Sequence, residues 1–258
     1  MSWDDRQRAM LAEMGFRLPR RAAAAEALAD DDADVAVAVA EPPLAPPRMP
    51  VAAPAPVARM AATAPLATGF AHLDVAGLRE AVATCRACGL GEQRRHAIHG
   101  SGALAQAQWL VVSDPPDEAD DAAGEPFVGD AGRLLDRMLL AAGQTRRGDA
   151  PTAFVTPLVK CRPPRGRAPQ PAELDACEAV LTRQVELLQP RLVLALGPQA
   201  ARRLTGLAEP LGRLRGRVHS WRGLPVVVSY HPAYLLRSPA DKAGAWDDLC
   251  LARKAANP

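Results

Sequence analysis

The sequence predicts an α/β fold in which helices cover both faces of a central, mostly parallel four-stranded sheet, a three-layer α/β/α arrangement. Short apolar runs alternate with helical patterns between residues 74 and 255, and this alternation is typical of parallel strands joined by crossover helices. The runs are continuously apolar, as expected for strands buried on both faces. Glycine or proline stands at many of the expected element ends, where each interrupts regular structure.

The first element of this domain is a helix over residues 74–88, because Asp74 can cap its first turn and Gly89 can end it. Pro171 suits the first position of a later helix. Trp246 and Leu249 are expected to face inward from the last helix. The other expected elements are helices over 132–143, 171–189 and 239–255, a short helix beginning at Gly197, an acidic loop over 114–130, and strands over 109–113, 152–159, 191–196, 218–221 and 226–229.

Two segments precede this domain. Residues 1–20 carry apolar side chains at helical spacing, which predicts an amphipathic helix that either packs on the domain or docks on a protein partner. Residues 21–73 are rich in alanine and proline, carry a run of aspartates and contain few large apolar side chains, as in a disordered linker. The predicted organisation is a helix, a linker and a folded domain over residues 74–258.

Composition narrows the class of protein. The sequence has no apolar run long enough to span a membrane, and its first residues are acidic, unlike a secretory signal. Residues 1–74 hold 7 basic and 10 acidic residues, a balance of −3, and the remainder holds 24 and 19, a balance of +5. We therefore expect a cytoplasmic, monomeric protein whose mildly basic domain is compatible with a polyanionic partner.

Four of the five cysteines have a spacing that suits a metal site. Cys85 and Cys88 form a C-x2-C pair, and Cys161 and Cys177 follow after 72 and then 15 intervening residues. In a reducing compartment such cysteines are expected to be metal ligands or free thiols rather than disulfides. Two ligands from one turn and two from separate segments can hold zinc or an iron–sulfur cluster.

Other interpretations of the cysteines remain open. The C-x2-C pair could form a local zinc site with His96 and His99, although their H-x2-H spacing is shorter than zinc fingers generally use. Reduced cysteines can also serve as small core residues, and this is the interpretation we favour for Cys250 on the last helix.

In the stretch from Phe154 to Arg167, an expected buried strand is followed by reactive and positively charged residues. An apolar run interrupted by Pro157 is followed by a lysine, a cysteine, two prolines and three arginines. The carboxyl end of a strand is where an open α/β sheet usually places its binding site. We expect the functional site at this end of the strand.

Several segments between residues 74 and 254 carry a resemblance to a known family. They are Cys-Arg-Ala-Cys (85–88), Gly-Glu-Pro-Phe-Val-Gly-Asp-Ala-Gly-Arg-Leu-Leu-Asp (124–136), Val-Lys-Cys-Arg-Pro-Pro (159–164), Cys177, Leu-Gly-x-x-Ala (196–200), Leu-Arg-Gly (214–216) and Tyr-His-Pro-Ala-Tyr-Leu-Leu-Arg-x-Pro (230–239). With them the domain resembles the uracil-DNA glycosylase superfamily, and most of all its iron–sulfur family 4, as a divergent member. The resemblance implies a uracil-DNA glycosylase-like fold.

The resemblance also implies roles for particular residues. His231 would donate a hydrogen bond to O2 of the departing uracil, where negative charge develops, and Asp114 would act through a water molecule. Phe127 would stack on the flipped base, with Pro115, Pro116, Pro157 and Ser229 around it. Cys85, Cys88, Cys161 and Cys177 would hold a [4Fe–4S] cluster. Tyr234, Leu235 and Leu236 would fill the gap left in the duplex, and Lys160, Arg162, Arg165, Arg167 and Arg237 would lie along the phosphates.

Two positions depart from the family pattern. The first family motif reads Gly-Glu-Ala-Pro-Gly, whereas residues 113–117 read Ser-Asp-Pro-Pro-Asp. The family carries an asparagine that reads the uracil edge four residues before the strand's cysteine, and this chain has Pro157 there. Proline offers neither a side-chain hydrogen bond nor a backbone N–H.

The resemblance implies a uracil-DNA glycosylase that hydrolyses the N-glycosidic bond of a flipped uracil in base excision repair. The two departures leave two alternatives. One is a DNA-binding or repair-partner module with little or no catalysis, and the other is a glycosylase for a different damaged base.

Overall fold

Residues 69–257 are the part of the chain that the computed structural model describes. The amphipathic helix expected over residues 1–20, and the linker expected over 21–73 except for its last five residues, lie outside the described residues. Within the described part, no helix has both the length and the apolar character needed to cross a membrane.

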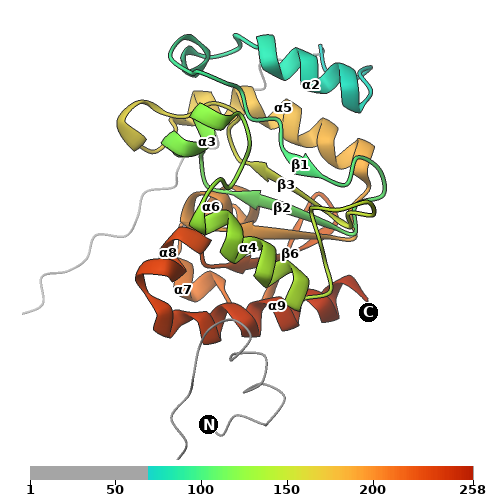
Figure 1. The fold of residues 1–258 in the computed structure, drawn as a ribbon, viewed down its shortest axis with the longest axis vertical. Helices are drawn as coiled ribbons and strands as arrows, with labels where there is room; N and C mark the ends of the chain where they lie inside the picture. Colours follow the sequence, from blue (N-terminus) through green and yellow to red (C-terminus); the bar gives the residue numbers. More distant parts are fainter. Residues whose placement is uncertain (1–68, 258) are drawn as a thin grey trace, which may run out of the picture. The chain divides into compact units, whose positions relative to one another are not determined.

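The domain is built on a six-stranded sheet with the strand order β1-β3-β2-β4-β6-β5 (Figure 1). Its four central strands are parallel neighbours, whereas β1 pairs antiparallel with β3 and β5 antiparallel with β6. The strands are β1 (Ser101–Gly102), β2 (Trp109–Ser113), β3 (Ala153–Pro157), β4 (Leu192–Leu196), β5 (Val218–Trp221) and β6 (Leu224–Ser229).

The expected α/β fold is confirmed, but the strand count of four is wrong. The four parallel strands form the centre, and two short antiparallel edge strands extend it to six. The sequence signal misses β1 because it has only two residues and no apolar pattern. Gly102 is required there, since a Cβ atom at this position would collide with the Ala153 carbonyl of β3.

Helices cover both faces of this sheet. On one face, α4 (Asp130–Ala141), α8 (Pro232–Arg237) and α9 (Lys242–Ala256) pack against Val111, Val155 and Leu194, and Trp246 and Leu249 point inward as expected. On the other face lie α5 (Pro171–Leu188), α6 (Pro198–Thr205) and α7 (Leu211–Leu214). Outside α5 lies α2 (Val75–Thr84), whose Leu78 and Val82 contact Val180.

Several short elements were not expected from the sequence. The acidic loop contains α3 (Glu118–Ala123), and α7 and α8 are also helical, each with six residues or fewer. A helix of one or two turns is too short to show a hydrophobic period, so its pattern resembles a loop. Conversely, α2 ends at Thr84, four residues earlier than expected, and so the C-x2-C pair lies in the loop after it.

Candidate functional site

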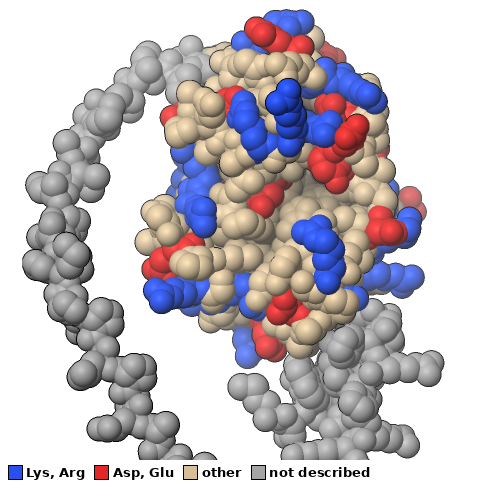
Figure 2. All heavy atoms as spheres, turned by 90° about the vertical axis from the view of Figure 1, so that its left-hand side faces the viewer, with Lys and Arg blue, Asp and Glu red and all other residues tan. Residues whose placement is uncertain are grey.

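An open pocket of about 490 Å³ lies where the parallel strands end. Asp114 directly follows β2, Pro198 begins α6 after β4, and His231 follows β6 by two residues. Figure 2 shows this face, with basic and acidic side chains interspersed around a hollow. The residues that line the pocket are Asp114, Pro115, Pro198, Leu211, Tyr230, His231, Ala233, Tyr234 and Arg237.

His231 is a neutral hydrogen-bond donor in this pocket. It is the N-cap residue of α8, and its Nδ1 accepts a hydrogen bond from the backbone N–H of Ala233 at 3.2 Å. Burial lowers the pKa of His231 to about 4, and Arg237 adds to this shift while Asp117 opposes it. At neutral pH the ring is therefore uncharged, and because Nδ1 accepts, Nε2 carries the proton.

Phe127 packs directly on this histidine. The two rings stack with their centroids 5.1 Å apart and an interplanar angle of 23°. Phe127 is only 5% exposed, and its backbone has a φ of +59°, which is uncommon for a residue with a side chain. The two residues expected to act on the base are thus brought together from loops that are about 100 residues apart.

Asp114 is tied to the start of α6. Its Oδ1 accepts hydrogen bonds from the backbone N–H groups of Gln199 at 2.8 Å and Ala200 at 2.9 Å. Burial raises the pKa of Asp114 to about 6, and these two N–H groups and Arg202 limit the rise. Gly197 leaves room for this carboxylate, because a Cβ atom there would collide with it. One carboxylate oxygen therefore anchors a helix, and only Oδ2 is left for a ligand.

Of the other expected base-binding residues, Phe127 is buried and does not line the pocket. Pro115 lines it, whereas Pro116 and Pro157 are buried outside its lining. Because side chains alternate along a strand, Pro157 shares the sheet face of Val155, the face on which Phe127 packs. Ser229 is fully buried beside the carboxylate of Asp248, and its assignment to the base pocket is not supported by this position.

Two of the residues expected to contact DNA are buried. Lys160 is only 2% exposed, and its Nζ donates to Thr156 Oγ1 at 2.5 Å, to Pro157 O at 2.8 Å and to Gln184 Oε1 at 3.0 Å. The Leu235 side chain is completely buried in the core between the sheet and its helices. Their assignments to the phosphates and to the duplex gap are therefore wrong, because neither side chain reaches the surface.

The remaining expected DNA contacts lie on the surface. Tyr234 and Leu236 are 37% and 43% exposed on α8, and Arg237 is exposed at its end. Arg165 is exposed, whereas Arg162 pairs with Glu118 at 3.1 Å and Arg167 pairs through two nitrogens with Glu173. Arg165, Arg237 and Leu236 are thus freer to meet a ligand than Arg162 and Arg167, whereas the Tyr234 hydroxyl donates to Asp241 Oδ2 at 2.6 Å.

The four cysteines of the expected cluster line one pocket. Cys85 and Cys88 come from the loop after α2, Cys161 from the segment after β3, and Cys177 from α5. Arg94 Nη1 donates to Cys161 Sγ at 3.3 Å, and the backbone N–H of Lys160 points to Cys177 Sγ at 3.5 Å. These four thiols are the residues that could hold a metal cluster.

The local zinc site is not formed in the described residues. His96 and His99 do not line the cysteine pocket, and His96 Nδ1 lies 2.9 Å from the Asp121 carbonyl oxygen. Among residues 69–257, no three cysteine, histidine or acidic side chains are arranged to hold a single metal ion. An all-thiol set is the chemistry of soft metals and iron–sulfur clusters, so the residues present fit a cluster spanning the pocket better than a Cys-His zinc ion.

Sequence reasoning missed several residues at the site. Pro198 and Leu211 line the pocket. Pro198 is an unspecified position of the family segment 196–200, and nothing in the sequence marks Leu211. Tyr230 lies in a segment of the family resemblance, and Arg215, from another such segment, stacks on its ring with the guanidinium carbon 3.9 Å from the centroid. Arg215 also pairs with the buried Asp248 at 2.7 Å. These supporting contacts link residues that are far apart in the chain.

A neutral histidine and a partly buried aspartate line a pocket at the carboxyl edge of a parallel sheet. Together they define an α/β protein with a pocket suited to acid–base or electrostatic chemistry. The profile of the uracil DNA glycosylase superfamily matches residues 99–250, more than half of the chain. The chain belongs to this superfamily.

Curated relatives identify the branch to which the chain is similar. It is 38% identical over 187 residues to the type-4 uracil-DNA glycosylase of Pyrobaculum aerophilum, covering 69% of this chain and 93% of that protein. It is 35% identical to the type-4 enzymes of Saccharolobus solfataricus, over 65% of this chain and 79% of that protein, and of Archaeoglobus fulgidus, over 61% and 81%. The expected resemblance to family 4 is confirmed.

The burial of His231 predicts an unusual titration. In an NMR titration of histidine-labelled protein, the ring of His231 should titrate with a midpoint of about 4 instead of 6.5. The folded state then binds fewer protons than the unfolded state between these values, so the contribution of His231 to stability decreases as the pH falls from 6.5 towards 4. A midpoint near 6.5, assigned with His231→Gln, would contradict the buried, neutral ring.

Proposed function

We propose that this chain is a uracil-DNA glycosylase that hydrolyses the N-glycosidic bond of a uracil flipped out of DNA, the first step of base excision repair. The observation that carries the proposal is the neutral imidazole of His231, which lines the open pocket with Nε2–H as its remaining donor. Enzymes that act on a base must extrude it from the stack into such a pocket.

The proposed reaction breaks the bond between N1 of uracil and C1′ of the sugar, and a water oxygen takes the place of the base at C1′. The proton that this water loses ends on the released uracil. The bonding electrons leave with uracil, and negative charge develops on its O2. A preorganised N–H aimed at this oxygen lowers the barrier without first having to reorient. His231 would supply this donor, and it stays neutral because partial burial lowers its pKa to about 4.

Asp114 is proposed to orient the water. Its Oδ1 is occupied by two backbone N–H groups of α6, so Oδ2 would accept a hydrogen bond from the water. Burial raises the pKa of Asp114 to about 6, so its carboxylate is ionised at neutral pH and becomes protonated as the pH falls through that value. Asp114 would therefore orient the water best above about pH 6, where its carboxylate is ionised.

Phe127 and the exposed side chains of α8 complete the proposed DNA site. Phe127 would offer its ring to the flipped base, since aromatic stacking tolerates any π surface. Tyr234 and Leu236 would fill the gap in the duplex, and Arg237 and Arg165 would contact phosphates. The role of Phe127 is inferred from its stacking on His231. The roles of the other four residues are inferred from the exposure of their side chains.

The four-cysteine pocket is proposed to hold a [4Fe–4S] cluster. Its residues come from three segments, the loop after α2, the segment after β3, and α5. When bound, the cluster would cross-link these segments through four thiolate bonds, as iron–sulfur ligation does elsewhere. Positive charge from Arg94, which donates to Cys161, would offset part of the thiolate charge.

Pro157 favours the two other candidate functions. A uracil whose polar edge stays unpaired in a buried pocket binds less well by about 1–3 kcal/mol per group, and Pro157 cannot supply the missing amide. A DNA-binding module with little catalysis, or a glycosylase for another damaged base, would not need that amide. Assays with several damaged bases distinguish these functions from the proposed one.

The proposed role of His231 can be tested on a duplex with a single uracil opposite guanine. His231→Ala should slow uracil excision by about 10²–10³-fold, the usual loss when one oxyanion donor is removed. His219→Ala is the matched control, because His219 lies on β5 outside the pocket lining. Wild-type protein that binds this duplex without releasing uracil would contradict the enzymatic function.

Replacing Pro157 with the asparagine that the family carries at this position should increase the rate of uracil excision. Pro157→Asn places a carboxamide on the sheet face of Phe127, and pairing of the uracil edge should raise kcat/KM for uracil about tenfold or more. Pro151→Asn, in the loop before β3, should leave it unchanged. If Pro157→Asn is folded and no faster than wild type, residue 157 does not limit uracil recognition.

The cluster proposal predicts which cysteines matter. Cys161→Ala and Cys177→Ala should each lose the broad visible absorbance and the iron content of protein purified without oxygen. Cys250→Ala should keep both, since Cys250 lies on α9 away from the cysteine pocket. Stoichiometric zinc in place of iron in the wild-type protein would overturn the cluster assignment.

A further inference from the structure

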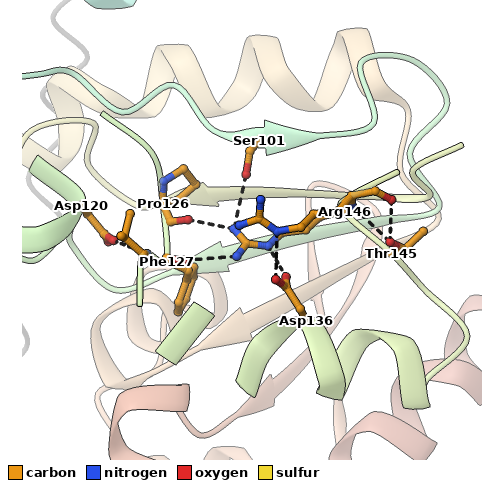
Figure 3. Close-up of polar contacts among 9 residues, drawn as sticks. Ser101, Asp120, Pro126, Phe127, Asp136, Thr145 and Arg146 are labelled. Atoms are coloured by element: carbon orange, nitrogen blue, oxygen red, sulfur yellow. Dashed lines mark hydrogen bonds and ion pairs between the residues drawn. The ribbon is translucent and has the colours of Figure 1, made fainter. Parts of the chain in front are cut away.

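Arg146 is a buried cation that holds the loop of Phe127. It is 5% exposed and lies between β1, α4 and this loop (Figure 3). Its Nη1 donates to Pro126 O at 2.8 Å and its Nη2 donates to Phe127 O at 3.2 Å. Its Nε donates to Asp136 Oδ1 at 2.5 Å. One guanidinium thus binds two successive backbone carbonyls and a carboxylate.

The fixed fork of arginine suits this arrangement. Its N–H groups lie in one plane at set angles, so three acceptors can be bound at once without further loss of side-chain freedom. The carboxylate of Asp136 balances the buried charge, because an unpaired cation in such a place would be strongly destabilising. A lysine keeps the charge, but its compact ammonium group does not reproduce the planar fork.

The segment that Arg146 binds needs external support. Phe127 has a φ of +59°, a conformation that costs of order 1–3 kcal/mol for a residue other than glycine. Gly132 of α4 lies against the Phe127 carbonyl so closely that a Cβ atom there would collide with it. On the other side, Asp120 Oδ1 accepts a hydrogen bond from the Val128 N–H at 2.9 Å (Figure 3).

The Phe127 ring carries this constraint to the functional site. It stacks on His231 with the ring centroids 5.1 Å apart, so it covers one face of the imidazole. Arg146 itself does not line the pocket that contains His231. Its influence on the site therefore passes through the backbone of Phe127.

We propose that Arg146 is a positioning residue that fixes Phe127 in its left-handed conformation and, through the stacked ring, sets the orientation and burial of His231. Its effect on catalysis rests on the function proposed above, whereas its effect on His231 does not. If Arg146 cannot bind the two carbonyls, Phe127 can leave its strained conformation and the stack on His231 opens.

The test compares Arg146→Lys with Arg147→Lys in the full chain. Arg147 is the matched control, because its Nε donates to the other oxygen of the same Asp136 at 2.9 Å but its side chain is exposed. Gly132→Ala is a second route to the same result, since the added methyl group displaces the Phe127 carbonyl without changing any charge. Thermal melts confirm that each variant is folded.

The first readout is the NMR spectrum of histidine-labelled protein, with the His231 signals assigned through His231→Gln. Arg146→Lys and Gly132→Ala should shift the His231 ring signals as the stacked ring moves away, and should raise its titration midpoint from about 4 towards 6.5. Arg147→Lys should change neither. Unchanged His231 signals in both Arg146→Lys and Gly132→Ala would overturn the proposal, as would equal changes in Arg147→Lys.

The second readout separates this proposal from the proposed function. Arg146→Lys should lower the single-turnover rate of uracil excision by about tenfold or more while binding of the abasic product duplex stays within about twofold, since misplacement of reacting groups affects chemistry more than binding. Shifted His231 signals in a protein whose wild type cuts no uracil would support the positioning role and overturn only the enzymatic function. Shifted signals with an unchanged excision rate would overturn the catalytic part of the proposal.

Discussion

The register of the four parallel strands is the constraint on which the site depends. Ser113 at the end of β2 pairs with Pro157 on one side and with Leu196 on the other, and Leu196 pairs with Ser229. The four strands therefore end along one line, and the loops that follow them meet there. Backbone hydrogen bonds extend this alignment one residue further, from Asp114 N to Leu196 O and from Gly197 N to Ser229 O. A shift of one residue would move every side chain to the opposite face of the sheet.

Buried charges around this edge hold the loops in place. Lys160 is bound by three oxygens, Arg146 by two carbonyls and Asp136, and Asp248 by Arg215. Burial lowers the pKa of Lys160 to about 7, and the nearby Cys177 and Cys161 oppose this shift. A buried ion that loses its partner destabilises the fold, so these pairs allow few alternative loop conformations.

The departures from the family pattern have a structural interpretation. Pro157 is the last residue of β3. Its missing N–H is not needed for pairing with β2, because the Leu158 N–H donates to Ser113 O. The strand end therefore tolerates proline without loss of the pairing between β2 and β3. At the first motif, the Asp114 carboxylate accepts hydrogen bonds from the first turn of α6, and Gly197 leaves the space that this carboxylate needs. Both strand ends thus accommodate the residues that depart from the family pattern.

By itself the sequence determined the fold class, the central strands and the grouping of the cysteines. The apolar runs and the C-x2-C pair involve residues that are close together in the sequence, so they can be recognised without the structure. Only the tertiary structure decided which side chains reach the site. Lys160 and Leu235 look available in the sequence but are buried, and Arg146, unmarked in the sequence, supports Phe127 from a different loop. The physical reason is that burial and pairing are set by packing between distant segments, whereas sequence patterns report only the preferences of neighbouring residues.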